Sequence, residues 1–197
     1  VLFCAAAPPS NCFASSLAWS PDIFAGAFYV SPPPSATLPA FSLVFVQSRD
    51  GNTGADNPFT LGGGEVDKHL IYEGLSQVAA DAVLTGADTI RGGDLIFGLW
   101  HPELIRLRSA LSKPRYPMQI VATLRGMNLD EGLIFNAPEV FVIVITVAGG
   151  AHAMRVGLAA RPWIRPIVMA TRHDLRDALV SLRTLGIERI SAVGGRH

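Results

Sequence analysis

Residues 79–91 read AADAVLTGADTIR, and the fold is decided by this stretch. The apolar run at 82–84 is followed by Gly86, which is typical of a buried strand that ends in a glycine turn. Asp88 and Thr89 then open a short helix. A strand, a tight turn and a helix N-terminus leave free backbone N–H groups that can hold an anion. The same pattern also fits a plain strand-to-helix connection that binds no ligand.

Two other junctions have the same character. The strand FSLVFVQ at 41–47 runs into Ser48-Arg49-Asp50-Gly51, in which Asp-Gly is a strong turn signal. The strand ERISAV at 188–193 is followed by Gly194-Gly195. In an open α/β sheet, ligands bind at the carboxyl ends of the strands. The three junctions together therefore indicate a ligand site at that edge.

Predicted strands and helices alternate along the chain from residue 41 onward, with short connections. This alternation predicts an α/β fold with a mainly parallel sheet in three layers. Pro166 places its strand near an edge of the sheet. The predicted strands are 41–47, 81–85, 118–123, 139–147, 163–170 and 188–193, the longer predicted helices are 65–80, 101–112, 149–160 and 175–185, and 125–137 is a predicted loop.

The cationic side chains of one predicted helix and its C-terminal flank have two readings. Arg106, Arg108, Lys113 and Arg115 crowd residues 101–115. We interpret them as a solvated face, and the alternative is that they meet a phosphate.

The bulk composition excludes several classes of function. The 16 basic and 16 acidic side chains give a formal net charge of zero, which argues against a nucleic-acid-binding surface built on bulk charge. No apolar run is long enough to span a bilayer. The five histidines and two cysteines do not show metal-ligand spacing, so we expect no metal site. A small-molecule partner in the cytoplasm remains the expectation.

Residues 1–39 differ from the rest of the chain. Asp22 is their only charged side chain, and prolines cluster at 8–9 and 32–34. The segment has no positively charged region of the kind that opens a secretory signal. We expect 1–39 to be a poorly ordered extension of a domain that spans 40–197. Residues 24–30 could form one strand or a helical turn.

Three stretches resemble the motifs of one enzyme family. They are FSLVFVQSRDG (41–51), ADAVLTGADTIRGGD (80–94) and GIERISAVGG (186–195). In order and spacing they resemble the bacterial riboflavin-pathway pyrimidine reductases, the C-terminal reductase half of a bifunctional deaminase/reductase with a dihydrofolate-reductase-like fold. The family motifs are an apolar strand with Ser-Leu-Asp-Gly, then Asp-Ala-x-Leu-x-Gly-x-x-Thr, then a strand with Glu-Gly-Gly. The resemblance covers residues 40–197.

The resemblance implies a reaction and its site. NADPH would lie across the carboxyl ends of the strands, and the enzyme would act as a 5-amino-6-(5-phosphoribosylamino)uracil reductase. Hydride transfer to C1 of the ring-opened imine would convert the ribosyl group of a phosphorylated aminopyrimidine to a ribityl chain. We expect a homodimer. The implied cofactor contacts are Gly86, Thr89, Asp94, Gly194 and Gly195, and the implied substrate contacts are Ser48, Asp50 and Thr60, with Asp50 also catalytic.

The chain departs from the family pattern at several places. Val193 stands where the family has Glu, Arg49 replaces an apolar residue, and 92–94 reads Gly-Gly-Asp in place of Asp-Asp-Pro. The family also continues past Gly-Gly with a helix and further strands, so we expect a chain truncated at its C-terminus. The alternatives are an inactive member that acts as a dimerising module, and a nucleotide-binding regulatory protein without hydride transfer.

Overall fold

The computed structural model describes residues 2–3, 13–15, 28–30, 33–45, 47–51, 64–92 and 95–193. The first three segments pair as a small antiparallel sheet with the strand order β1-β3-β2. Its strands are β1 (Leu2–Phe3), β2 (Phe13–Ser15) and β3 (Phe28–Val30). Residues 28–30 are therefore a strand, which is one of the two structures expected for 24–30. The division of the chain at residue 39 stays a prediction.

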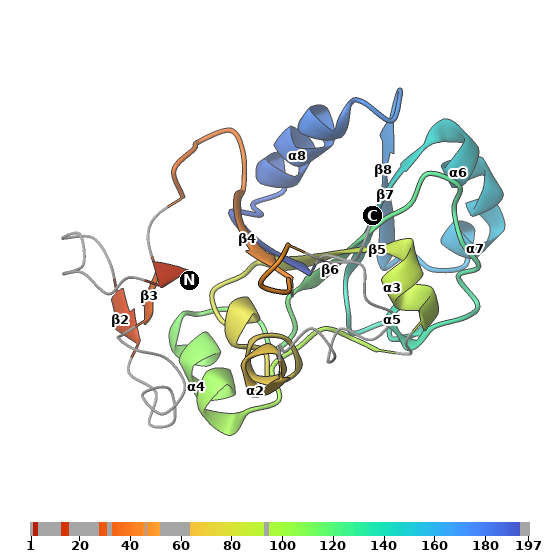
Figure 1. The fold of residues 1–197 in the computed structure, drawn as a ribbon. Helices are drawn as coiled ribbons and strands as arrows, with labels where there is room; N and C mark the ends of the chain where they lie inside the picture. Colours follow the sequence, from red (N-terminus) through yellow and green to blue (C-terminus); the bar gives the residue numbers. More distant parts are fainter. Residues whose placement is uncertain are drawn as a thin grey trace.

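A six-stranded sheet forms the centre of the molecule (Figure 1). Its strand order is β4-β9-β5-β6-β7-β8, and all neighbouring strands are parallel. The predicted α/β class with a parallel sheet is confirmed. The strands match the six predicted ones to within three residues at each end: β4 (Ala40–Val44), β5 (Ala82–Gly86), β6 (Met118–Ala122), β7 (Val142–Val147), β8 (Ile164–Met169) and β9 (Arg189–Val193).

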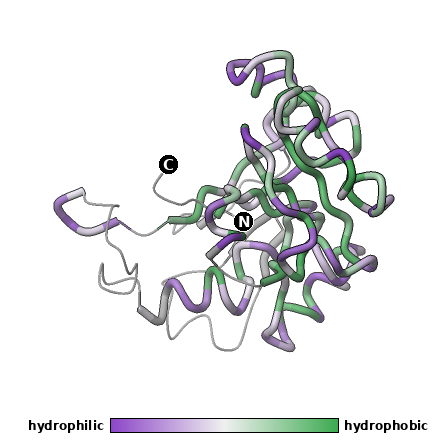
Figure 2. The backbone as a smooth tube through the Cα atoms, turned by 90° about the vertical axis from the view of Figure 1, so that its right-hand side faces the viewer, coloured by the Kyte–Doolittle hydropathy of each residue, from purple (hydrophilic) through white to green (hydrophobic). Residues whose placement is uncertain are grey.

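Helices cover both faces of this sheet, which confirms the predicted three layers (Figure 1). On one face, α8 (Leu175–Thr184) packs Ala178 and Leu182 on the strands, and Gly186 follows it with a φ of 85°. The other face carries α3 (Ala87–Gly92), α5 (Leu133–Asn136), α6 (Ala148–Ala153) and α7 (Arg155–Ala159). The strands between these layers are mostly hydrophobic, and hydrophilic residues gather in the outer turns (Figure 2). β7 is buried on both faces, as its β-branched run predicts.

The predicted continuous helix over 65–80 is wrong. The chain forms α2 (Gly64–Asp67), a π-helical segment η2 (Lys68–Tyr72) and a 3₁₀ turn η3 (Leu75–Gln77). Gly74 separates the last two because it adopts a left-handed φ of 92°, which ends a helix. The backbone of Gly98 and Leu99 lies directly against it: a Cβ on Gly74 would meet the Gly98 carbonyl oxygen at 2.7 Å.

Helix α4 (Pro102–Ala110) confirms the helix expected at 101–112. His101 caps it, and its Nδ1 accepts a hydrogen bond from the backbone N–H of Glu103 at 3.3 Å. The solvated-face interpretation is right for Arg106 and Arg115, which are exposed. It is wrong for Arg108, whose side chain is only 1% exposed.

Arg108 is buried because a set of main-chain carbonyls surrounds it. Its Nη1 donates to the oxygens of Gln77 at 2.8 Å and Ala80 at 2.6 Å, and its Nε donates to that of Pro114 at 2.6 Å. Burial lowers the pKa of Arg108 to about 10, with Asp81 raising it, so the side chain is charged at neutral pH. It therefore fixes the irregular segment that leads into β5.

Asp81, the first residue of the second motif, has a structural role at the amino ends of the strands. Its Oδ2 accepts hydrogen bonds from the backbone N–H groups of Glu188 at 2.9 Å and Arg189 at 2.8 Å. Its Oδ1 pairs with Lys113. Asp81 thereby fixes the register of β5 against β9, at the opposite end of β5 from Gly86.

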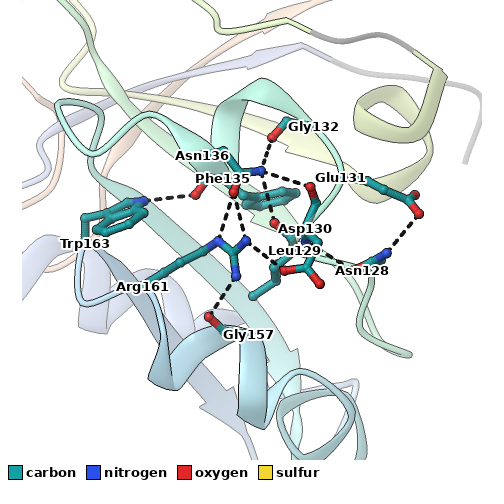
Figure 3. A network of polar contacts seen from close by, with 10 residues as sticks. All are labelled: Asn128, Leu129, Asp130, Glu131, Gly132, Phe135, Asn136, Gly157, Arg161 and Trp163. Carbon is teal, nitrogen blue, oxygen red and sulfur yellow. Dashed lines mark hydrogen bonds and ion pairs between the residues drawn. The ribbon is translucent and has the colours of Figure 1, made fainter.

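The predicted loop 125–137 contains the single turn α5, and polar contacts hold it to the start of β8 (Figure 3). Asn136 donates to three carbonyls of this loop and accepts from Arg161. Arg161 also pairs with Asp130 at 2.8 Å, and Trp163 donates to the Phe135 carbonyl at 3.0 Å. The predicted helix 149–160 is likewise two short helices, α6 and α7.

Candidate functional site

A cleft of about 450 Å³ opens at the carboxyl ends of three adjacent strands, β9, β5 and β6. A volume of this size lies within the range of about 300–1,000 Å³ that is usual for small-molecule and cofactor sites. The carboxyl edge of a parallel sheet is also where ligands bind in open α/β folds. The residues that line the cleft are Leu84, Thr85, Gly86, Ala87, Asp88, Thr89, Arg91, Ala122, Thr123, Leu124, Arg125, Ala192 and Val193.

The strand order brings the three predicted junctions to one edge. The last strand in the sequence, β9, lies between β4 and β5 and is parallel to both. The ends of β4, β9 and β5 are therefore neighbours, although the chain between β4 and β9 contains four other strands of this sheet. The sequence predicted the character of these junctions, and the sheet supplies their proximity.

Gly86 and Thr89, two of the five predicted cofactor contacts, both line the cleft. Gly86 is exposed, and a Cβ built on it would meet no atom within 4 Å, so the surface beside it is open. Helix α3 begins at the next residue, beside the end of β5 (Figure 1). Asp88 in its first turn forms an ion pair with Arg91 on the rim. The pattern at 86–89 thus forms a wall of the cleft.

Ser48 and Asp50 lie in the turn that follows β4, outside the set of lining residues. The N–H of Gly51 donates to the Ser48 carbonyl at 2.9 Å, and Ser48 Oγ donates to Asp50 Oδ1. The turn role that Asp-Gly predicts is confirmed. β4 is two strands from β5, which corresponds to about 10 Å at the usual spacing between strands. The other predicted contacts, Thr60, Asp94, Gly194 and Gly195, lie outside the described residues.

Sequence reasoning missed the part of the site that β6 supplies. Thr123, Leu124 and Arg125 follow this strand and line the cleft. They belong to none of the three motifs, so only the position of β6 beside β5 identifies them. Arg125 is exposed and forms no ion pair with any residue that the structure describes. It adds a positive charge to the rim, which already holds the Asp88–Arg91 pair.

The wall formed by β9 is apolar. Val193 is 8% exposed, lines the cleft and packs in the same cluster as Val83 and Val121. The carboxylate that the family pattern has at this position is therefore replaced by a side chain that belongs to the core.

Within the described part of the chain, no group of three or more His, Cys, Asp or Glu side chains is arranged to hold a metal ion. No helix in those residues has the length and apolar character needed to cross a bilayer.

Solved structures with a similar fold come from bacterial reductase-related proteins. A pyrimidine reductase-like protein from Corynebacterium diphtheriae matches with a TM-score of 0.57 at 21% identity, over 80% of this chain and 66% of that one. Two forms of Acinetobacter baumannii RibD match with TM-scores of 0.56 and 0.55 at 20% and 18% identity, over 81% of this chain and 40% of theirs. No protein-family model and no curated protein matches the sequence. The chain therefore has the fold of these proteins and spans only part of their length.

Proposed function

We propose that the chain is an NADPH-dependent reductase of a phosphorylated aminopyrimidine, with the cofactor in the cleft. The observation that carries the proposal is the cleft itself, which lies at the carboxyl ends of β9, β5 and β6 in a fold shared with a pyrimidine reductase-like protein. The motif resemblance adds the substrate class. When bound, NADPH would supply the hydride for the ribosyl C1 of the ring-opened imine.

The residues of the cleft fit a dinucleotide with phosphates. Arg91 and Arg125 stand at the rim, where guanidinium groups can hold phosphate oxygens through charge-assisted hydrogen bonds. Gly86 leaves room for a ligand to approach the backbone at the start of α3. The protein therefore binds and orients the cofactor with exposed cations and open backbone.

The substrate would lie toward β4. The turn after β4 lies on the other side of β9 from β5 and β6, so a pyrimidine bound at that turn and a nicotinamide bound over β5 can meet above β9. Asp50 would orient a substrate hydroxyl or move a proton, and the Ser48 hydroxyl that donates to Asp50 would hold its carboxylate in place. This arrangement gives β4 the substrate and β5 and β6 the cofactor.

The proposal is tested by binding and turnover with matched arginine variants. Wild-type protein is titrated with NADPH and NADH, and NADPH consumption is followed with an aminopyrimidine ribotide. Arg125→Gln should weaken NADPH binding by about tenfold, the effect of one charge-assisted hydrogen bond. Arg106→Gln, which removes an exposed arginine of α4 outside the cleft, should bind as wild type does. Absence of NADPH binding by the wild-type protein would refute the cofactor assignment.

A second candidate is a nucleotide-binding or dimerising module without hydride transfer. Val193 favours it, because the carboxylate expected near the substrate is missing. The exposed aromatic and aliphatic side chains of edge strand β4 and the residue after it, Phe41, Leu43 and Phe45, favour a second copy of the chain as partner. NADPH binding without consumption, together with a dimer in sedimentation, would select this reading over the reductase.

A further inference from the structure

Thr85, the fourth residue of β5, carries a polar atom that the fold leaves unsatisfied. The residue is 3% exposed, lines the cleft, and its hydroxyl has no hydrogen-bond partner among the residues that the structure describes. A buried polar group without a partner is unfavourable, and native structures rarely keep one without a reason.

Other buried hydroxyl groups in the described chain do have partners. Ser76 donates to the Leu70 carbonyl at 2.8 Å, and Ser191 donates to Ser76 at 3.2 Å. Thr123, which also lines the cleft, donates to the Gly126 carbonyl at 3.2 Å. The remaining unpartnered buried atoms, on Gln77, Arg108 and Arg183, belong to residues that do not line the cleft. Among the described residues that line the cleft, Thr85 is therefore the one with an unsatisfied buried polar atom.

The surroundings of Thr85 limit what can pair with it. Val121 lies beside it in register on β6, and Val193 follows the residue of β9 that pairs with Leu84. Both valines are buried and apolar. A phosphate here would lose its hydration without a cation to replace it, because Arg91 and Arg125 lie at the exposed rim. An uncharged group with hydrogen-bonding atoms, such as a carboxamide or a ribose hydroxyl, fits this environment.

We propose that the Thr85 hydroxyl is a ligand contact that receives the uncharged end of the cofactor, while its phosphates stay at the rim. The inference rests on the proposed function, and it names a contact and a ligand orientation that the motifs do not assign. For NADPH the uncharged end is the nicotinamide riboside, and the adenosine half carries the additional phosphate. A valine could fill the same place in β5, so the hydroxyl is what distinguishes Thr85 from a core residue.

The experiment separates the two ends of the ligand with two probes. NADPH and adenosine 2′,5′-bisphosphate are titrated into wild-type protein, Thr85→Val, Thr85→Ser and Arg125→Gln, and each variant is melted without ligand. Thr85→Val should weaken NADPH binding by about tenfold and leave the bisphosphate unaffected, while Thr85→Ser should stay within about threefold of wild type for NADPH. Arg125→Gln should weaken both probes. Without ligand, Thr85→Val should melt no lower than wild type, because it removes an unpaired hydroxyl.

Each contrary result has a distinct meaning. If Thr85→Val binds NADPH as wild type does, or melts at a lower temperature than wild type without ligand, the hydroxyl is not a ligand contact and the inference is wrong. If the variant loses both probes equally, the proposed orientation falls. If the wild-type protein binds neither NADPH nor the bisphosphate, the proposed function fails, and the Thr85 contact fails with it.

Discussion

Gly74→Ala should destabilise the protein far more than the same substitution at Gly186. Both glycines have left-handed backbones, with φ values of 92° and 85°. A Cβ on Gly186 would meet nothing within 4 Å, whereas one on Gly74 would lie 2.7 Å from the Gly98 carbonyl oxygen and 2.9 Å from Leu99 Cα. The pair therefore shares the conformational penalty and differs in the steric clash.

The magnitudes follow from these two contributions. A left-handed non-glycine residue costs roughly 1–2 kcal/mol, and this applies to both variants. Overpacking against a backbone that cannot move aside adds about 1–3 kcal/mol at Gly74 alone. Because Leu99 belongs to the buried cluster of Leu75, Val78 and Leu104, relief of the clash would disturb that cluster. The difference between the variants should be about 2 kcal/mol.

Thermal melts and urea unfolding of the two variants measure this difference. For a chain of this size, about 2 kcal/mol corresponds to a gap of about 4–8 °C in Tm, with Gly74→Ala melting lower. The gain from reduced freedom of the unfolded chain is common to both substitutions and cancels. Equal melting temperatures would show that the segment 98–99 does not lie against Gly74, and the explanation of the broken helix would then be wrong.

Three other substitutions test buried groups. Arg108→Met should lower the free energy of unfolding, measured in urea, by about 3 kcal/mol or more, because it leaves several buried carbonyls without a donor. The control, Arg106→Met at an exposed position, should stay within about 0.5 kcal/mol of wild type, and equal effects would contradict the burial of Arg108. Burial raises the pKa of Asp67 above its ordinary 3.8, so the unfolded chain deprotonates first and the folded state loses stability as the pH rises through that window. Asp67→Asn should therefore raise the free energy of unfolding near neutral pH, by about 1.4 kcal/mol for each pH unit between the pKa of Asp67 in the unfolded chain and its pKa in the folded protein. At a pH below the unfolded-chain pKa, urea unfolding should show no gain, and a gain at both neutral and acid pH would contradict the prediction. Val193→Glu should lower the free energy of unfolding by about 2–4 kcal/mol at neutral pH and by less in acid, because it would place a carboxylate in an apolar cluster. An unchanged melting temperature would mean that the side chain at position 193 faces solvent.

Local patterns predicted the elements whose structure depends on local chemistry. The β-branched run that becomes β7 needs burial on both faces, and the apolar stripe of α8 is closed by Gly186 in the left-handed region. In both cases the residues that decide the element lie within it or next to it. The α/β class followed from the alternation of such elements.

The errors arose where distant parts of the chain decide the outcome. Gly74 ends a helix because residues 98–99 lie against it. Arg108 is buried because the interrupted helix about thirty residues earlier leaves main-chain carbonyls that accept its hydrogen bonds. The apolar periodicity of 65–80 and the cationic composition of 101–115 contain neither fact. The strand order also depends on distant residues, because Asp81 accepts a hydrogen bond from the backbone of a residue more than a hundred positions later.

The second motif has two separate structural parts, one at each end of β5, and this separation determines how much its match can say about function. Asp81, at the amino end, joins β5 to β9 by accepting main-chain hydrogen bonds, and this role in the sheet does not depend on a ligand. Gly86 and Thr89, at the carboxyl end, line a cleft and do not share that role. The first part of the motif therefore argues for the fold, and only the second argues for a ligand. Because Thr85 and Arg125 lie beside that second part and the motif specifies neither, their variants test the function independently of the resemblance.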